Sequence, residues 1–402
     1  MTDFDAVFAN ALLTSGARAH VAVAAGTIAA VLPASDAVPA AGETTDLKGA
    51  MLVPGFVEGH IHLDTSFYGD AWKPHIPCTN GFDVHERVRF QAQNLASAAP
   101  MDERARNQLE LCIAQGSTAM RSHVMIDAGV GLSHLETIMA VREDYRHLID
   151  IQLCAFPQGG ILASPGTAEL LDEAIALGCD LVGGLDPATF DRDIEGHLDV
   201  VFGIAERRGV DVDIHLHDGG TLGTFEIEQI AARTRALGMG GRVAVSHAYG
   251  LGDIGAEAQK KIAATLAASG VAIMTNAPGA SSFPPVAILR QAGVTVFSGS
   301  DNIRDSWWPY GDGDMLGRAN IIGYRSGFYA DWELEAAFDI VTAAGAKALR
   351  LEGYGIVAGA KADFVSFAAQ HVPEAVVAVP RERSVYKGGR LVARNGQLVG
   401  RG

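Results

Sequence analysis

One pattern repeats through the middle of the chain, between about residues 55 and 350: a short apolar run is followed by a helix-like segment. The first run is MLVPGFVEGHIH, and later ones include GVDVDIHLH, GRVAVSHA and GVTVFSGSD, about eight in all. Helix-like segments such as TAELLDEAIALG end in glycine, the residue that commonly follows the last turn of a helix. Repeated strand–helix units of this number and spacing predict a parallel (β/α)8 barrel. A doubly wound open sheet is the alternative, but no glycine-rich dinucleotide fingerprint follows the first run.

The two ends of the chain have a different pattern, that of short strands joined by tight turns. Residues 4–32 contain the turn signals SGAR and AAGT, and the C-terminal region contains KGGR and RNGQ beside β-branched residues. We therefore expect residues 1–54 and 352–402 to form one small composite β-domain. Residues 55–351 are expected to form the barrel.

Charge and composition argue against several classes of partner. The formal net charge is −16 without a long basic run, so nucleic acid and anionic membranes would be repelled. No stretch approaches about 18 uninterrupted apolar residues, and the N-terminus lacks a basic segment followed by a long apolar one, so we expect neither a membrane span nor a secretory leader. The cysteines are scattered without a CxxC pair, which favours a reducing compartment. The sequence thus predicts a cytoplasmic protein, which we also expect to be a homo-oligomer.

Histidines and one aspartate follow several of the apolar runs. Side chains two residues apart on a strand share a face, so the imidazoles of VEGHIHLD point to the same side. In a parallel barrel the carboxyl ends of all strands meet at one mouth. We therefore expect convergence there of the side chains that end four of the runs, namely His60, His62, His215, His247 and Asp301.

Three more polar residues are candidates for the same mouth. His217 shares a strand face with His215, Asp218 follows where that strand should end, and Gln158 follows the run IDIQLCAF. Taken singly, each of the candidates has an ordinary explanation as a hydrogen-bonded core residue or a turn residue. Taken together they need compensation, because buried unpaired imidazoles and carboxylates cost several kcal/mol. A divalent metal supplies this compensation. Ligation by histidine and carboxylate, in the absence of cysteine, suits Zn²⁺, Fe²⁺ or Mn²⁺ and leaves one position open for water.

The segments around this cluster supply weaker candidates. His123 is expected to support the site, and Trp307 or Trp308 to form a wall of the pocket. Residues 67–100 form a long segment after the first strand, and a lid is one reading of it.

The motifs PGFVEGHIHLDTS, AFPQGGI, DIHLHD, VSHA and GSDNIRDSWWPYG occur in an order that resembles the amidohydrolase superfamily. The likeness covers nearly the whole chain. It implies a (β/α)8 barrel with a β-sandwich built from the two ends. It also implies one metal ion per chain, Zn²⁺ or Fe²⁺, held by His60, His62, His215 and Asp301. In the family, the residue aligned with His247 positions or polarises the water, and the one aligned with Gln158 contacts the substrate.

Within the superfamily the chain resembles the cytosine deaminase-like branch, with departures around the substrate. HIHLDTS is similar to cytosine deaminase, whereas GCDLVGGLDPAT and SDNIRDSWWPYGDGDM are more similar to N-isopropylammelide amidohydrolase. Cytosine deaminases carry Glu at the position of Asp218 and a second Asp at the position of Asn302. The triazine enzyme typically has Lys at the position of Thr65. These departures cluster around the substrate, and we expect Asn302, Thr65 and Trp307, together with Gln158, to contact its ring.

The resemblance implies hydrolytic removal of an exocyclic amine from a small nitrogen heterocycle of the cytosine type. A bound metal would make hydroxide available near neutral pH. Asp301 would take the water proton, and Asp218, or His217 in its place, would protonate the ring nitrogen. Alternatives are an N-alkylaminotriazine or pterin amidohydrolase and a cyclic amide hydrolase, although no strand-end lysine is available for a two-metal site. A non-catalytic metal-binding protein is a further alternative.

Overall fold

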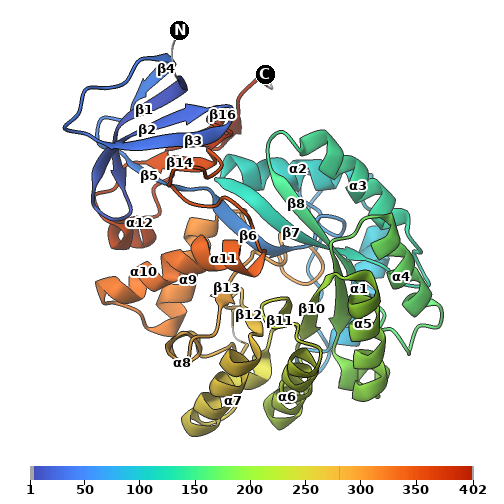
Figure 1. Cartoon of the computed structure of the whole chain (residues 1–402). Coiled ribbons are helices and arrows are strands. Elements are labelled where there is room, and N and C mark those ends of the chain that lie inside the picture. Colours follow the sequence, from blue (N-terminus) through green and yellow to red (C-terminus); the bar gives the residue numbers. More distant parts are fainter. Residues whose placement is uncertain (1–3, 280, 401–402) are drawn as a thin grey trace.

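Eight parallel strands from the middle of the chain form one sheet in which the order along the chain is kept (Figure 1). The computed structural model describes residues 4–279 and 281–400. The strands are β6 (Phe56–Ile61), β7 (Ser117–Met125), β8 (Asp150–Phe156), β9 (Leu181–Leu185), β10 (Asp211–Leu216), β11 (Val243–His247), β12 (Ala272–Met274) and β13 (Val296–Phe297). Each neighbouring pair is parallel.

Backbone hydrogen bonds bring the two edges of this sheet together. The amide of Gly59 on β6 donates to the carbonyl of Ser298, just after β13, at 3.0 Å, and the amide of Asp301 donates to the carbonyl of His60 at 2.7 Å. The first strand therefore pairs with the segment after the last one, which gives the (β/α)8 barrel that the sequence predicts. The doubly wound open sheet is excluded.

Helices surround the barrel and follow its strands (Figure 1). Helix α5 illustrates their ends: Gly209 follows it with φ of 70°, in the left-handed region where glycine is favoured. The helices are α1 (Val84–Leu95), α2 (Met101–Ala114), α3 (Ser133–Tyr145), α4 (Thr167–Leu177), α5 (Ile194–Arg208), α6 (Gly220–Ala236), α7 (Ala256–Ser269), α8 (Val286–Gln291), α9 (Met315–Ser326), α10 (Asp331–Ile340), α11 (Ala343–Ala348) and α12 (Val372–Ala378). Two short turns, η1 (Pro187–Asp191) and η2 (Tyr249–Gly252), follow β9 and β11.

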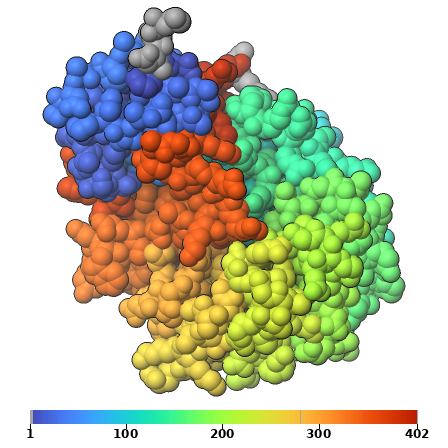
Figure 2. All heavy atoms as spheres, in the orientation of Figure 1, coloured from blue at the N-terminus to red at the C-terminus, as the bar shows by residue number. Residues whose placement is uncertain are grey.

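Both ends of the chain contribute to a second, nine-stranded sheet. Its N-terminal strands are β1 (Phe4–Leu13), β2 (Arg18–Ala24), β3 (Thr27–Pro33), β4 (Ala41–Asp46) and β5 (Met51–Pro54), and its C-terminal strands are β14 (Phe364–Phe367), β15 (Arg383–Lys387), β16 (Arg390–Arg394) and β17 (Gln397–Leu398). Strand β5 pairs with β14, which joins the two halves. Figure 2 shows the blue N-terminal and the orange to red C-terminal segments side by side. The composite β-sandwich is confirmed as part of the fold class, and the domain boundaries at residues 54 and 352 stay a prediction.

Aromatic residues from both ends of the chain pack together in the apolar core of this second sheet. The ring of Phe8 on β1 lies 4.7 Å from that of Phe364 on β14 and 4.8 Å from that of Tyr386 on β15. Apolar residues of the same strands, Leu12 and Val365, also join the large core beneath the barrel. The β-rich part is thus packed onto the barrel. Among the described helices, none has the length and apolar character needed to cross a membrane.

Candidate metal centre and active site

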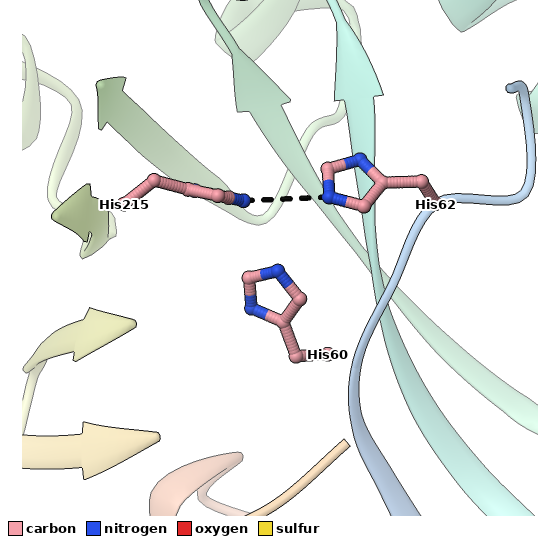
Figure 3. Close-up of side chains that lie close together, drawn as sticks. All are labelled: His60, His62 and His215. Carbon is pink, nitrogen blue, oxygen red and sulfur yellow. Dashed lines mark hydrogen bonds between the residues drawn. The ribbon is translucent and has the colours of Figure 1, made fainter. Parts of the chain in front are cut away.

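Three imidazoles meet at the carboxyl end of the barrel strands. His60 lies on β6, His62 follows that strand two residues later on the same side, and His215 lies on β10. One ring nitrogen from each lies within 4.8 Å of the others, and His60 forms a second such group with His247 and Asp301. Figure 3 shows the rings of His60, His62 and His215 turned toward one space. The structure therefore brings together all five residues that the sequence predicted to converge.

The spacing of these groups, and the protonation of two of the three imidazoles, fit a divalent metal. The Nε2 atoms of His62 and His215 lie 3.4 Å apart, and Oδ1 of Asp301 lies 3.6 Å from Nε2 of His60 and 3.5 Å from Nε2 of His62. Tetrahedral ligands at metal distances of about 2.0–2.1 Å are roughly 3.3–3.4 Å apart. Nε2 of His60 is buried without a hydrogen-bond partner among the described residues. Burial, followed by the neighbouring imidazoles, holds the pKa of His60 and His215 well below the usual range, so both rings are neutral, as ligation requires.

Asp301 is held in a conformation that residues other than glycine seldom adopt. Its φ is 59°, in the left-handed region. Its Oδ2 accepts a hydrogen bond of 3.0 Å from the side-chain amide of Asn276. Burial alone would raise the pKa of this carboxyl, but the neighbouring imidazoles, with a hydrogen bond from His62, lower it, so a carboxylate faces the imidazoles. Backbone strain at a polar cluster is typical of functional sites.

His247 lies at the end of β11 and is also strained, with φ of 73°. Its Nδ1 is 3.9 Å from Oδ2 of Asp301, and neither ring nitrogen has a hydrogen-bond partner among the described residues. Burial is the main cause that lowers its pKa to about 3. His247 is therefore a neutral imidazole whose nitrogens are available to a water or a substrate.

His217 is oriented by Asp186, the residue directly after β9. Oδ2 of Asp186 lies 2.8 Å from Nδ1 of His217, and Oδ1 accepts the backbone amide of His217 at 2.5 Å. A carboxylate only accepts, so Nδ1 carries a proton and Nε2 is left for the cavity. The ring stacks on His247 at 4.5 Å and on Trp307 at 6.0 Å. Burial lowers the pKa of His217, but the charge and hydrogen bond of Asp186 outweigh it and the pKa is raised.

The carboxyl of Asp218 lies outside the lining of the cavity. Its Oδ1 accepts a short hydrogen bond from the hydroxyl of Thr189, and its Oδ2 is buried without a partner among the described residues. It does not line the cavity, whereas His217 does. Beside it lies Glu226 of α6, whose carboxyl accepts the amide of Ala188 at 2.9 Å. Burial first, and Asp218 second, raise the pKa of Glu226 to about 9, so Glu226 is neutral at pH 7.

Gln158 has a fixed amide orientation. The indole N–H of Trp307 donates to Oε1 of Gln91 at 2.6 Å, and Nε2 of Gln91 donates to Oε1 of Gln158 at 3.3 Å. An indole N–H can only donate, so it fixes the orientation of Gln91, which in turn fixes that of Gln158. The side-chain NH2 of Gln158 is therefore presented to the cavity as a hydrogen-bond donor.

A cavity of about 1080 Å³ opens over the cluster. It is lined by His62, His215, His217, His247 and Asp301, and also by the expected substrate contacts Gln158, Thr65, Asn302 and Trp307. It extends along α9, where Arg318 and Ile321 line it. Asn302 donates to Asp305 at 2.6 Å, which holds the loop that carries Trp307.

The segment 67–100 forms one wall of the cavity. Its residues Phe82, Arg87 and Gln91 line the space, the last two from α1. Arg87 donates to the carbonyl of Ser306, which ties the segment to the opposite loop, and to the carbonyl of Ile76 within the segment. This arrangement shows a wall, and movement of the segment as a lid stays a prediction.

Three of the residues that shape the site escaped the sequence reasoning. Asp186 carried a usable signal, because it is the first residue after the apolar run LVGGL. Gln91 and Asn276 carried none, since a glutamine in a helix and an asparagine in a loop are ordinary there. His123, expected to support the site, is fully buried and stacks on His60 at 3.9 Å.

Known proteins resemble this chain in sequence and in fold. A family model described as the amidohydrolase family matches residues 43–399. N-isopropylammelide isopropyl amidohydrolase of Pseudomonas sp. (strain ADP) is 32% identical over 364 residues, which cover 88% of this chain and 89% of that protein.

Two crystal structures extend the likeness to three dimensions. N-isopropylammelide isopropylaminohydrolase from Burkholderia multivorans has a TM-score of 0.92 and 38% identity, covering 98% of this chain and 100% of its own. The 5-methylcytosine deaminase from Klebsiella pneumoniae, liganded with phosphonocytosine, has a TM-score of 0.85 and 27% identity, covering 96% and 98%.

Proposed function

Because the chain belongs to the amidohydrolase family, we propose that it removes an exocyclic amine, in particular an N-alkylated one, from a small oxo-heterocycle of the triazine or pyrimidine class. It is a hydrolase that acts on carbon–nitrogen bonds other than peptide bonds. One observation carries the proposal: a group of imidazoles and the Asp301 carboxylate line a cavity that also presents the oriented amide of Gln158. A non-catalytic metal-binding protein needs no such cavity.

We propose that His60, His62, His215 and Asp301 hold one divalent metal ion, zinc or iron. Members of the family bind such an ion, and the donors here are separated as tetrahedral ligands are. When bound, the ion lowers the pKa of a coordinated water toward neutrality and so supplies a nucleophile at physiological pH.

Asp301 and His247 act on the attacking water. The carboxylate of Asp301 takes the first water proton and passes it to the leaving amine. His247 is neutral and lies beside Oδ2 of Asp301, so its free nitrogen accepts a hydrogen bond from the water and orients it. Both residues are fixed by strained backbone, which keeps them in place without the substrate.

His217 carries the second proton. As an imidazolium held by Asp186, it donates from Nε2 to the ring nitrogen beside the reacting carbon, which makes that carbon more electrophilic. The proton balance closes when the second water proton returns to His217 and the ring nitrogen keeps the proton that it received. Asp218 had been the first candidate for this step on sequence, but the cavity position of His217 favours the histidine.

Gln158 orients the ring. Its NH2 group faces the cavity as a donor, so it pairs with a ring carbonyl or an unprotonated ring nitrogen. Trp307 lies parallel to His217, with 23° between the ring planes, and offers a flat wall for a planar ring. Thr65 and Asn302 line the remaining sides.

The size of the cavity favours a substituted amine. Ligand sites for drug-sized molecules typically measure about 300–1,000 Å³, and this cavity measures about 1080 Å³. A bare pyrimidine would leave the part along α9 empty, whereas an N-alkyl group would enter it. The names of the Pseudomonas and Burkholderia relatives agree with such a substrate. Removal of the unsubstituted amine of cytosine or 5-methylcytosine is the second candidate, supported by the similarity to the Klebsiella enzyme.

The test is amine release by the zinc-loaded and the iron-loaded protein across one panel of heterocycles. The panel contains N-isopropylammelide, cytosine, 5-methylcytosine, isocytosine and pterin, with dihydroorotate as a cyclic amide. We expect the highest kcat/KM for the N-alkylated triazine. Preference for cytosine would move the substrate to the second candidate, and opening of dihydroorotate without any amine release would refute the deaminase proposal.

We propose that the protein is cytoplasmic and forms a homo-oligomer. All four cysteines are free thiols, as is usual for a cytoplasmic protein. Light scattering of the purified protein tests the expected homo-oligomer.

A further inference from the structure

A charged column runs through the interior of the barrel beneath the metal centre. Arg121 on β7, Asp213 on β10 and Ser246 on β11 have exposed fractions of 2%, 0% and 0%. The interior of such barrels is ordinarily filled by layers of branched apolar side chains. A buried ion pair is often no more stable than apolar residues of similar volume, so its presence here calls for a role other than stability.

The column ends on His60, and each bond fixes the next. Nη1 of Arg121 donates to Oδ2 of Asp213 at 2.8 Å, and the hydroxyl of Ser246 donates to Oδ1 of Asp213 at 2.6 Å. Oγ of Ser246 lies 3.0 Å from Nδ1 of His60. Because Ser246 has one proton and gives it to the carboxylate, its oxygen must accept from His60. Nδ1 of His60 is therefore protonated, and Nε2 carries the lone pair that faces Asp301.

The other end of the column is anchored to the base of the barrel. Arg121 donates from Nη2 to the carbonyl of Ala348 at 3.1 Å and to Oε1 of Gln152 at 3.2 Å. Gln152 in turn donates to the carbonyl of Leu349 at 2.6 Å. Ala348 is the last residue of α11, and Leu349 follows that helix. Hydrogen bonds thus hold the column at both ends, which keeps the hydroxyl of Ser246 between Asp213 and His60.

His123 restrains the ring of His60 from its face. The two rings stack at 3.9 Å with 29° between their planes, and Nε2 of His123 lies 3.7 Å from Oδ2 of Asp213. The ring of His60 is therefore held both at Nδ1 and across its plane. Rotation that would exchange its two nitrogens meets both contacts.

We propose that Ser246, Asp213 and Arg121 are positioning residues that hold His60 as the Nδ1-protonated tautomer and thereby set the affinity of the site for its metal. The inference rests on the proposed function only in taking His60 as a metal ligand. Partners that hold the outer nitrogen of a ligating histidine typically change metal affinity by about 10–100-fold when lost.

The test compares Ser246→Ala with the matched control Ser298→Ala. Ser298 is also fully buried, and its hydroxyl donates at 2.6 Å to the carbonyl of Thr275, with a longer contact of 3.5 Å to the carbonyl of Gly299, neither of which belongs to a metal ligand. Zinc affinity is measured by competition with a chromophoric chelator. We expect the dissociation constant to rise by roughly 10–100-fold in Ser246→Ala, and to stay close to that of the wild type in Ser298→Ala. Equal affinities in the two variants would overturn the proposal.

A second readout needs no metal and separates this inference from the proposed function. In ¹⁵N-histidine-labelled, metal-free protein, with the signal assigned by loss in His60→Gln, the couplings of the ring show which nitrogen bears the proton. We expect Nδ1 protonation in the wild type and in Ser298→Ala, and loss of that preference in Ser246→Ala. Nε2 protonation of His60 in the wild type would overturn the inference. Failure of the wild type to bind zinc, with Nδ1 protonation observed, would refute the proposed metal site and leave the column as described.

Discussion

Replacing Asp186 by asparagine tests the assignment of His217 as the proton carrier. Asp186 accepts two hydrogen bonds from one residue, from the backbone amide and from Nδ1 of His217. In Asp186→Asn the side-chain oxygen must keep accepting the backbone amide, because that amide can only donate. The NH2 group then faces Nδ1 of His217, and Nδ1 must become an acceptor. The neutral ring is held with its proton on Nε2, and protonation of Nδ1 is opposed.

The size of the effect follows from the bond that is lost. A hydrogen bond to a charged group contributes about 1.5–3 kcal/mol, which corresponds to roughly a 10–150-fold change in the ratio of imidazolium to neutral imidazole at a given pH. Asp186 raises the pKa of His217, so the variant lowers it and fewer molecules hold the imidazolium at neutral pH. We expect kcat to fall by roughly 10–150-fold at pH 8, in proportion to the lost imidazolium, and by less at pH 6. Metal content should not change.

The chain supplies a matched control in a second buried carboxylate–histidine pair. Oδ2 of Asp191 lies 2.7 Å from Nδ1 of His197, and neither residue lines the cavity. Asp191→Asn should lower thermal stability and leave the pH dependence of kcat intact. The reasoning is refuted if Asp186→Asn keeps wild-type kcat across pH 6–8, or if both variants lose activity equally.

Four further substitutions separate the roles of residues in and beside the cavity. Asp218→Asn should keep most of its activity while His217→Ala loses about 10²-fold or more in kcat, and the reverse order in a steady-state assay would return the proton step to Asp218. Gln91→Leu removes the donor that orients Gln158, so KM should rise by roughly 2–10-fold, the equivalent of one net hydrogen bond, with kcat changed less. Glu226 has a pKa of about 9, raised from 4.5. Its contribution to the free energy of unfolding is therefore full below pH 4.5 and is lost as the pH rises to about 9. The loss is up to about 1.4 kcal/mol for each pH unit. Glu226→Gln should therefore unfold at a higher temperature than the wild type at pH 8–9, and a pH profile of melting that matches the wild type would contradict this.

The barrel and its histidines were predictable because their signals are local. The strand alternation that put His60 and His62 on one face needs only a few neighbouring residues, and the carboxyl ends of parallel strands meet by topology. The same alternation explains why His217 lines the cavity and Asp218 does not. Asp213, His215 and His217 point inward along β10, and the alternation continues past its end, so Asp218 falls on the opposite side.

The partners of these histidines were not predictable, because they depend on contacts far apart in sequence. Ser246 reaches His60 across 186 positions, and Trp307 reaches Gln91 across 216. A serine in a strand and a glutamine in a helix have many ordinary roles. Which of them holds a catalytic group is decided only when the barrel closes and the segment 67–100 packs as a wall of the cavity.

The central claim is that a single bound metal at His60, His62, His215 and Asp301 enables removal of a ring amine. The most direct measurement is amine release from N-isopropylammelide by protein stripped with a chelator and then titrated with zinc. The account predicts no release by the stripped protein and a linear rise that reaches its maximum near one zinc per chain. Full activity in the stripped protein, or no amine release at any zinc loading from this substrate or from cytosine, would contradict it.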